Sequence, residues 1–241
     1  MSNKKKKVMK IEKHKRINDI LLGPIERPLI AWFVKRMPRW VTPDVLTSIG
    51  FFAAILIGAS YWLTKYDKNF LWLANFGFLL NWFGDSLDGN LARFRKIERP
   101  RYGFFIDHIV DTVSEVAIFL GLGLSPYVDY NLATLALIAY LCMTIQVYIT
   151  TNVEGIFRIS YGKLGPTEAR AIAITANTIV FFIGNPAIAL PFGIVPIYNL
   201  IVALVIILLF MIFFITAAKE SKHLKKKDRK KQLKKNKAKT K

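Results

Sequence analysis

Residues 201–218, IVALVIILLFMIFFITAA, are almost entirely apolar and carry no charge. A helix of this length nearly crosses a bilayer core of about 30 Å. The whole chain is 53% hydrophobic, yet its formal net charge is +19. A soluble protein with this charge would bind nucleic acid or acidic partners, whereas a membrane protein puts apolar runs in the bilayer and Lys and Arg in the flanks. The long uncharged run favours a membrane protein.

Several further segments have the length that a spanning helix needs, which is about 20 residues. We therefore predict an all-α, polytopic membrane protein with about six transmembrane helices. The predicted spans are residues 43–64, 69–94, 102–124, 129–153, 168–187 and 194–218. The chain then divides into a basic arm with an interfacial segment (1–42), a six-helix transmembrane domain (43–218) and a lysine-rich tail (219–241).

The N-terminal part mixes charge with apolar residues. Residues 1–16 form a basic arm, and no apolar stretch follows it directly, so we expect no cleaved signal peptide. Residues 17–39 contain Pro24, Pro28 and Pro38. We predict an amphipathic segment, broken by proline, at the membrane surface; a soluble linker is the alternative. The single cysteine, Cys142, leaves the redox compartment open.

Cations gather in alternate connections. They occur in the N-terminal arm, in the loops that include residues 93–101 and 158–170, and in the tail, whereas the loops at 65–68, 125–130 and 185–193 are short and poor in cations. The positive-inside rule then puts both termini in the cytoplasm, which requires an even number of spans.

The tail, residues 219–241, is rich in lysine. We interpret it as a solvated cytoplasmic end that helps to fix topology. The alternative is attraction to anionic membrane lipids, at about 1 kcal/mol per basic residue close to the surface. Nucleic-acid binding is not predicted, because the tail shows neither interleaved aromatic residues nor a folded module.

Four aspartates lie within this membrane sequence. Asp85 and Asp88 are three residues apart, and Asp107 and Asp111 are four apart, so each pair shares one face of a helix. The first pair falls near the end of one predicted span and the second near the start of the next. We expect the two helices to be antiparallel neighbours whose carboxylates face each other just inside the cytoplasmic interface.

Clustered carboxylates repel one another and need cations, protonation or a partner. Arg93 could pair with one of them. Four oxygen donors on two helices suit hard divalent cations such as Mg²⁺ or Mn²⁺, with room for two ions. The small residues Gly89, Ala92 and Gly103, with Arg93, suggest a cleft for a nucleotide diphosphate; ordinary helix packing is the alternative for them.

Acidic residues in spans also mark ion and proton pathways. An ion- or proton-coupled transporter is therefore the alternative function. A transporter predicts acidic or polar residues deep in several spans. Here the acids cluster at one cytoplasmic level, and the last predicted span has none. This distribution favours metal-dependent chemistry.

The pattern of residues 85–111 resembles the signature of the CDP-alcohol phosphotransferase (CDP-alcohol phosphatidyltransferase) family, integral membrane enzymes of phospholipid synthesis. The matching positions are Asp85-x-x-Asp88-Gly89-x-x-Ala92-Arg93 and Gly103-x-x-x-Asp107-x-x-x-Asp111. The spacer at 94–102 has nine residues, one more than is usual in the family. The difference falls in a loop and leaves both helical faces intact.

The resemblance implies two divalent ions, Mg²⁺ or Mn²⁺, held by Asp85, Asp88, Asp107 and Asp111. It also implies that Asp111 is the general base. A CDP site would be shaped by Gly89, Ala92, Arg93 and Gly103. An acceptor hydroxyl would attack the phosphorus on the far side of the CDP diphosphate, and CMP would leave. Homodimers are common in the family, so a homodimer is possible.

Two subclasses of the family fit the chain. One uses CDP-diacylglycerol and a polar acceptor, and the other uses CDP-choline or CDP-ethanolamine and a lipid acceptor. The segment 37–47, in which Asp44 replaces an Asn, the His108 that follows Asp107, and GPTEAR at 165–170 resemble the second. The length of the chain resembles prokaryotic enzymes of the first.

Four residues are candidates for the acceptor or its head group: His108, Glu168, Arg158 and Lys163. Each has a structural alternative. His108 could be an interfacial histidine, and Glu168 could simply start a helix, where an acidic residue suits the dipole. Arg158 and Lys163, like Arg170, could bind a phosphate on a polar acceptor or merely enforce topology.

Overall fold

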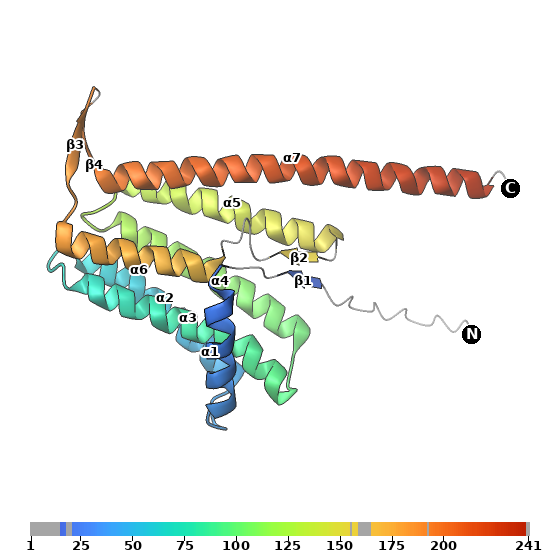
Figure 1. Ribbon diagram of the computed structural model, residues 1–241, viewed down its shortest axis with the longest axis horizontal. Coiled ribbons are helices and arrows are strands. Elements are labelled where there is room, and N and C mark those ends of the chain that lie inside the picture. The colour runs from blue at the N-terminus through green and yellow to red at the C-terminus, as the bar shows by residue number, and fades with distance from the viewer. Residues whose placement is uncertain (1–14, 18–20, 155, 159–164, 192, 240–241) are drawn as a thin grey trace, which may run out of the picture.

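The computed structural model describes residues 15–17, 21–154, 156–158, 165–191 and 193–239. Helices dominate this part of the chain (Figure 1). They are α1 (Gly23–Arg36), α2 (Pro43–Leu63), α3 (Phe70–Arg95), α4 (Pro100–Gly123), α5 (Tyr130–Glu154), α6 (Pro166–Ile183) and α7 (Ile197–Lys239). Four short strands are β1 (Lys15–Ile17), β2 (Ile156–Arg158), β3 (Ala187–Leu190) and β4 (Gly193–Pro196).

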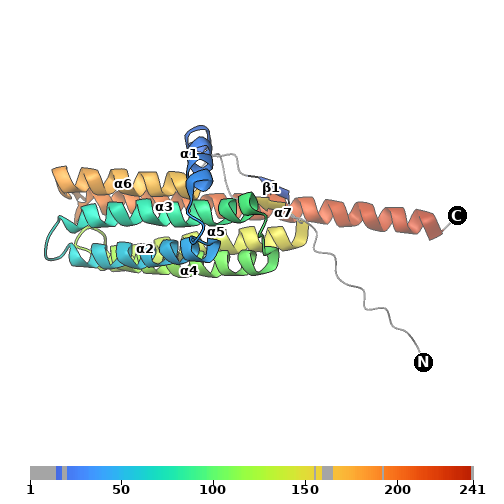
Figure 2. The same ribbon diagram turned by 90° about the horizontal axis from the view of Figure 1, so that it is seen from below.

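The helices α2 to α7 run roughly alongside one another, and α1 crosses them (Figures 1 and 2). Neighbouring contacts follow the order α6, α3, α2, α4, α5 and α7. The two small sheets, parallel β1–β2 and antiparallel β3–β4, add little to this bundle. The predicted all-α fold is therefore confirmed.

One expected neighbour relation is wrong. α3 and α4 were expected to pack side by side, but α2 packs against both of them and they barely touch each other. Glycines explain the close approach of α2. A Cβ on Gly84 of α3 would lie 2.5 Å from the backbone N of Gly50, and one on Gly121 of α4 would lie 2.3 Å from the backbone O of Gly58. The space between α3 and α4 is left for side chains.

α1 corrects the expectation of a segment broken by proline. Pro24 lies in the first turn, where a missing N–H costs nothing, and Pro28 is accommodated inside the helix. The helix ends at Arg36, and the extended residue Met37 precedes Pro38, as expected before a proline. α1 packs through Val34 and Phe33 onto α2 and α3, while an apolar stripe remains exposed at Leu21, Ile25, Leu29 and Trp32.

The local sequence explains where the site helices begin and end. Thr42 caps α2 by accepting a hydrogen bond from the N–H of Val45, and Pro43 occupies the first turn. α3 ends at Arg95, and the next residue, Lys96, adopts a left-handed conformation with φ of 57°. α4 then begins at Pro100. The loop that connects α3 to α4 is thus only four residues long.

Two predicted span limits need correction. α6 ends at Ile183 rather than 187, and α7 begins at Ile197 rather than 194. Gly184 with φ of 79° stops α6. The intervening residues form the β3–β4 hairpin, which extends from the end of the bundle (Figure 1).

α7 runs without interruption from Ile197 to Lys239, so the predicted boundary at residue 219 is not the end of a helix. The segment contains neither Gly nor Pro, and its Lys, Leu, Gln and Ala residues are good helix formers. The C-terminal part of α7 extends beyond the rest of the bundle (Figures 1 and 2).

Three helices in the described part of the chain are long and apolar enough to cross a membrane: α2, α5 and α7 through Lys230. α3, α4 and α6 carry the charged residues of the candidate site. The count of six spans therefore stays a prediction.

Candidate active site

All four aspartates of the motif line one small pocket between α3 and α4, against α2. Its lining residues are Thr47, Gly50, Asn81, Asp85, Asp88, Asp107, Val110, Asp111 and Ser114. α2 forms one wall because its glycine contact with α3 brings the two backbones together. The predicted convergence of the two carboxylate pairs is thus achieved across α2 rather than by direct packing of α3 on α4.

The deep end of the pocket is polar. Asn81 of α3 donates from Nδ2 to the backbone O of Gly50, 2.8 Å away. Ser114 of α4 is only 7% exposed, and its Oγ has no hydrogen-bond partner among the described residues. Both residues lie one turn beyond the aspartates, so hydrogen-bonding groups continue below the carboxylates.

Asp85 forms an ion pair with Arg170 of α6. Nη2 of Arg170 lies 2.7 Å from Oδ2 of Asp85, and Nε of Arg170 donates to Oδ1 of Asn81 at 2.8 Å. The buried Nη1 has no hydrogen-bond partner in the described part of the chain. The guanidinium therefore fixes α6 against α3 and leaves one buried N–H group without a partner among the described residues.

Asp88 is 8% exposed and is held from α2. Its Oδ2 accepts a hydrogen bond of 2.7 Å from Oγ1 of Thr47, and its Oδ1 accepts one from the N–H of Gly89. Thr47 lies in the segment whose resemblance to the family was noted, but its contact with an aspartate 41 residues away was not foreseen.

The oxygen donors fit a hard divalent cation in type. Among the described residues, however, no three His, Cys, Asp or Glu side chains converge closely enough to hold an ion as they stand. Instead, Asp85 accepts a hydrogen bond from Arg170, and Asp88 accepts one from Thr47. Because the four carboxylates share one pocket, side-chain rotation is the change that ion binding would require.

The residues expected to shape a CDP site lie near the C-terminal end of α3 and the N-terminal end of α4. The Arg93 side chain folds over Gly89, where a Cβ would meet its Nη1 at 3.4 Å, and its Nη2 donates to Asn90. Ala92 is half-buried. A Cβ on Gly103 of α4 would meet no atom within 4 Å. The space at Gly103 is thus open to a ligand.

The sequence profile of the CDP-alcohol phosphatidyltransferases matches residues 40–219, which includes α2 to α6 and much of α7. The chain belongs to this family. The predicted resemblance is confirmed, and with it the assignment to a family of membrane proteins of phospholipid synthesis.

Individual relatives differ in the reaction that their names describe. A phosphatidylinositol phosphate synthase of Cutibacterium acnes is 40% identical over 85 residues, 35% of this chain and 38% of that protein. Cholinephosphotransferase 1 of Gallus gallus is 30% identical over 168 residues, 66% of this chain and 49% of that protein. A CDP-diacylglycerol–serine O-phosphatidyltransferase of Encephalitozoon cuniculi is 29% identical over 192 residues, 74% and 48% respectively. The matches cover less than half of these relatives' lengths.

His108 of this CDP-alcohol phosphatidyltransferase homologue does not line the pocket. Its ring lies between those of Phe104, with centroids 4.0 Å apart, and Tyr148 of α5, at 4.5 Å, and is tilted against both. The reason is helical geometry, since a residue directly after Asp107 points about 100° away from it. His108 therefore lies between α4 and α5.

Glu168 is buried, at 4% exposure, by backbone contacts. Oε2 accepts from the N–H of Gly165, which caps α6, and Oε1 accepts from the N–H of Leu22 at 2.8 Å. The contact with Gly165 fits the structural alternative considered for Glu168, in which this residue starts a helix. The backbone of Arg158 lies in β2, and Lys163 lies outside the described residues.

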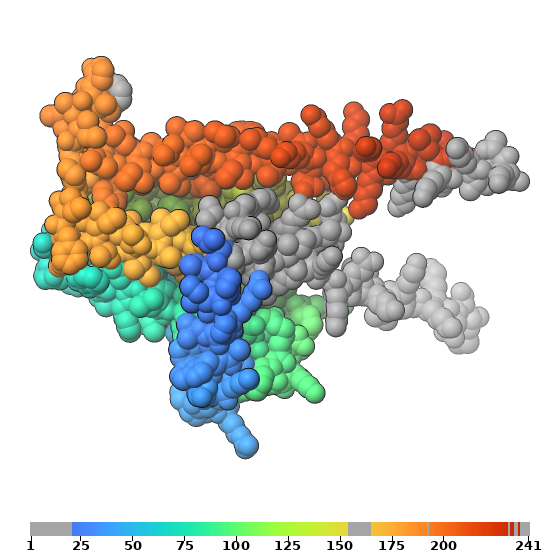
Figure 3. Space-filling model, in the orientation of Figure 1, coloured from blue at the N-terminus to red at the C-terminus, as the bar shows by residue number. Residues whose placement is uncertain are grey.

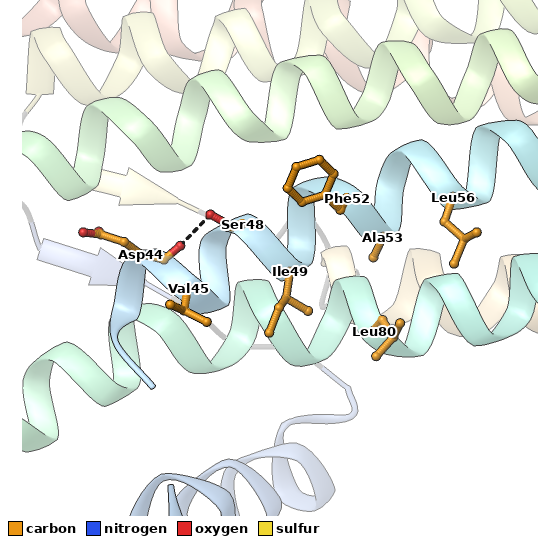
Figure 4. Close-up of a pocket in the computed structure, with 8 residues that line it drawn as sticks. All are labelled: Asp44, Val45, Ser48, Ile49, Phe52, Ala53, Leu56 and Leu80. Atoms are coloured by element: carbon orange, nitrogen blue, oxygen red, sulfur yellow. Dashed lines mark hydrogen bonds between the residues drawn. The ribbon is translucent and has the colours of Figure 1, made fainter. Parts of the chain in front are cut away.

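A second hollow lies on the outer side of α2 and α3 (Figure 4). Its walls are apolar except for Asp44 and Ser48. Ser48 donates to the backbone O of Asp44, and the Asp44 carboxylate pairs with Arg99. The polar groups are thus engaged within the protein, and the apolar walls suit a helix surface that faces acyl chains.

Sequence reasoning missed the residues that support the carboxylates. Arg170 was considered as a phosphate-binding or topology-setting cation, but its ion pair with Asp85 was not foreseen, although a charged residue just inside a predicted span could have marked it. Thr47, Asn81 and Ser114 had no such signal, because single polar residues in a span are common and their partners lie far away in sequence.

Proposed function

We propose that the pocket is the active site of a CDP-alcohol phosphotransferase. The enzyme would move a substituted phosphate from a CDP-alcohol to an acceptor hydroxyl and release CMP. The observation that carries the proposal is the meeting of Asp85, Asp88, Asp107 and Asp111 in one pocket of a chain that belongs to this family.

The four aspartates would hold two divalent ions, Mg²⁺ or Mn²⁺, as their oxygen donors suit. When bound, these ions would offset the negative charge on the diphosphate and on the CMP leaving group. Gly89, Ala92, Arg93 and Gly103 would receive the CDP moiety at the open end of α3 and α4, where the structure leaves space beside Gly103.

Asp111 is the proposed general base. It lies on the α4 wall of the pocket, with Ser114 one turn below it. The Asp111 carboxylate would accept the proton of the acceptor hydroxyl, whose oxygen attacks the phosphorus as the bond to CMP breaks. A base in this role needs to come within about 2.6–3.2 Å of the hydroxyl oxygen.

Arg170 would keep the Asp85 carboxylate oriented, and its Nη1, which has no hydrogen-bond partner among the described residues, would donate to the transferred phosphate. Among the predicted acceptor residues, His108 and Glu168 are already packed or hydrogen-bonded, and Arg158 and Lys163 remain candidates for a phosphorylated acceptor. The donor is either CDP-diacylglycerol or CDP-choline/ethanolamine, since the names of the relatives include both kinds.

The positive loops favour an enzyme with its active site and both termini in the cytoplasm of the cell, held in the membrane by about six spans. In a bacterium this would be the inner membrane. The basic tail would contribute to that topology and to contact with anionic lipid. A homodimer remains possible.

The deciding experiment is a panel of donors. Purified protein with Mg²⁺ or Mn²⁺ is incubated with CDP-diacylglycerol or with CDP-choline and CDP-ethanolamine, each with candidate acceptors. CMP release and the lipid product are then measured. Release of CMP with one donor class supports the proposal and identifies the subclass. Protein that releases no CMP from any CDP-alcohol, but moves ions or protons in liposomes, would support the transporter instead.

A further inference from the structure

Glu26 of α1 is buried although α1 lies on the surface of the bundle (Figure 3). The residue as a whole is 9% exposed. One oxygen, Oε1, accepts three hydrogen bonds from side chains of other helices. The donors are Nε1 of Trp82 at 3.0 Å, Oγ of Ser86 at 3.1 Å and Oγ1 of Thr167 at 3.0 Å.

These donors belong to the two helices that carry the ion pair of the pocket. Trp82 and Ser86 are on α3, and Thr167 is on α6. Ser86 directly follows Asp85, and Thr167 lies three residues before Arg170. Glu26 therefore bridges α3 and α6 about one helical turn from the Asp85–Arg170 pair.

α1 is fixed at both of its ends as well as at Glu26. At its start, the N–H of Leu22 donates to Glu168 of α6. Beyond its end, Arg95 of α3 donates to the backbone oxygens of Met37 at 3.0 Å, Pro38 at 2.8 Å and Val41 at 2.6 Å. The helix thus presents Glu26 to α3 and α6 at a defined position.

Packing alone does not require a carboxylate here. Val34 and Phe33 already bury the opposite half of α1 against α2 and α3, and Phe33 meets Phe83 edge-on at 5.2 Å. A buried carboxylate is costly unless it is hydrogen-bonded. The three donors meet that requirement, and they do so by joining α3 and α6 beside the Asp85–Arg170 pair. Farther along, the same two helices contact each other through the Asn75–Asn177 hydrogen bond and an apolar cluster that includes Phe78 and Val180.

We propose that Glu26 is a positioning residue, which sets the spacing of α3 and α6 and thereby holds Asp85 and Arg170 in place for the reaction. The inference rests on the proposed function of the pocket. Glu26 touches neither substrate nor ion; its effect passes through Ser86, Trp82 and Thr167.

The test uses the full chain in detergent or nanodiscs and compares Glu26→Ala, Glu26→Gln and Glu220→Ala. The alanine loses all three contacts. The glutamine keeps an oxygen at the place of Oε1, which can accept the same three hydrogen bonds. Glu220→Ala removes a carboxylate from α7, outside the pocket lining. Three quantities are measured for each: kcat and KM for CMP release, Mn²⁺ binding by EPR without substrate, and thermal unfolding without metal.

We expect Glu26→Ala to lower kcat and to weaken Mn²⁺ binding, each by about tenfold or more, as removal of groups that orient metal ligands does elsewhere. The KM for the CDP-alcohol should change much less. Glu26→Gln and Glu220→Ala should keep kcat, KM and Mn²⁺ affinity within about twofold of the unsubstituted protein, and should leave its melting temperature unchanged. Folded Glu26→Ala protein with unchanged kcat and Mn²⁺ affinity would overturn the inference, whatever its melting temperature.

Should Glu26→Ala not fold, Thr167→Val decides, because it removes only the donor on α6. A loss of Mn²⁺ affinity at unchanged thermal stability supports the inference, and wild-type affinity overturns it. Failure of the proposed function is recognised separately: the unsubstituted protein would then neither release CMP nor bind Mn²⁺.

Discussion

The guanidinium of Arg170 and the carboxylate of Asp85 meet at 2.7 Å, although 85 residues separate them. The contact joins α6 to α3 at the edge of the pocket. It also supplies positive charge beside four carboxylates that would otherwise only repel one another. Several expected outcomes follow from this arrangement and from its neighbours.

Replacing Arg170 by Met should destabilise the protein by about 1–3 kcal/mol, because the hydrogen bonds to Asp85 and Asn81 are lost and the half-buried Asp85 carboxylate is left without its cation. CMP release should fall as well. Thermal unfolding and a CMP assay measure the two effects. Arg229→Met, in the exposed part of α7, is the matched control. Wild-type stability and rate in Arg170→Met would contradict the role of the pair.

Thr47→Val keeps the shape of the side chain but removes the hydroxyl that donates to Asp88. We expect the Mg²⁺ concentration for half-maximal CMP release to rise by about 10–100-fold, as for other residues that orient metal ligands. Thr47→Ser retains a hydroxyl and should behave nearly as the unsubstituted protein does. Equal Mg²⁺ dependence of the Val and Ser variants would argue against this contact.

Gly84→Ala should destabilise the fold by about 1–3 kcal/mol or more, because its Cβ would meet backbone atoms of Gly50 and Leu46 at 2.5 Å. Backbone on a packed helix cannot move aside as a side chain can. Gly103→Ala, with no atom within 4 Å of its Cβ, should leave the melting temperature unchanged and raise the KM for the CDP-alcohol. Similar melting temperatures for the two variants would refute the α2–α3 contact.

Asp111→Asn should lower kcat by about 10²–10⁴-fold, since an amide cannot accept the proton of the acceptor hydroxyl. Asp44→Asn makes the same chemical change outside the pocket and should leave kcat unchanged. The rate of CMP release with saturating substrates measures both. Near-normal turnover of Asp111→Asn would exclude Asp111 as the base.

Chelation of divalent ions with EDTA should abolish CMP release, and added Mg²⁺ or Mn²⁺ should restore it, because the pocket offers only hard oxygen donors. Full activity after exhaustive chelation would show that the carboxylates serve another purpose.

The aspartates and their helices could be predicted because the relevant patterns are local. The spacing of Asp85 and Asp88, and of Asp107 and Asp111, fixes which face of a helix they share, and apolar runs mark the helices themselves. The prediction that α3 packs directly on α4 was wrong because helix packing depends on residues that are distant in sequence. Chain proximity does not reveal that glycines at 50 and 84 let α2 pack closely on α3, while α2 also packs on α4.

Long-range polar contacts were beyond sequence reasoning. Glu26 and Thr167 are 141 residues apart, and no periodicity connects them. The unbroken α7 was also missed, because a change from apolar to lysine-rich composition indicates a change of environment and not the end of a helix.

The contact of Gly50 with Gly84 has a consequence for which ligands the pocket can adapt to. Where two backbones touch, there is no side chain whose rotation could widen that wall. The part of the pocket wall where α2 meets α3 is therefore rigid. Any difference in the size of the ligand that the pocket admits must come from the parts of its lining that are built of side chains, such as the α4 wall.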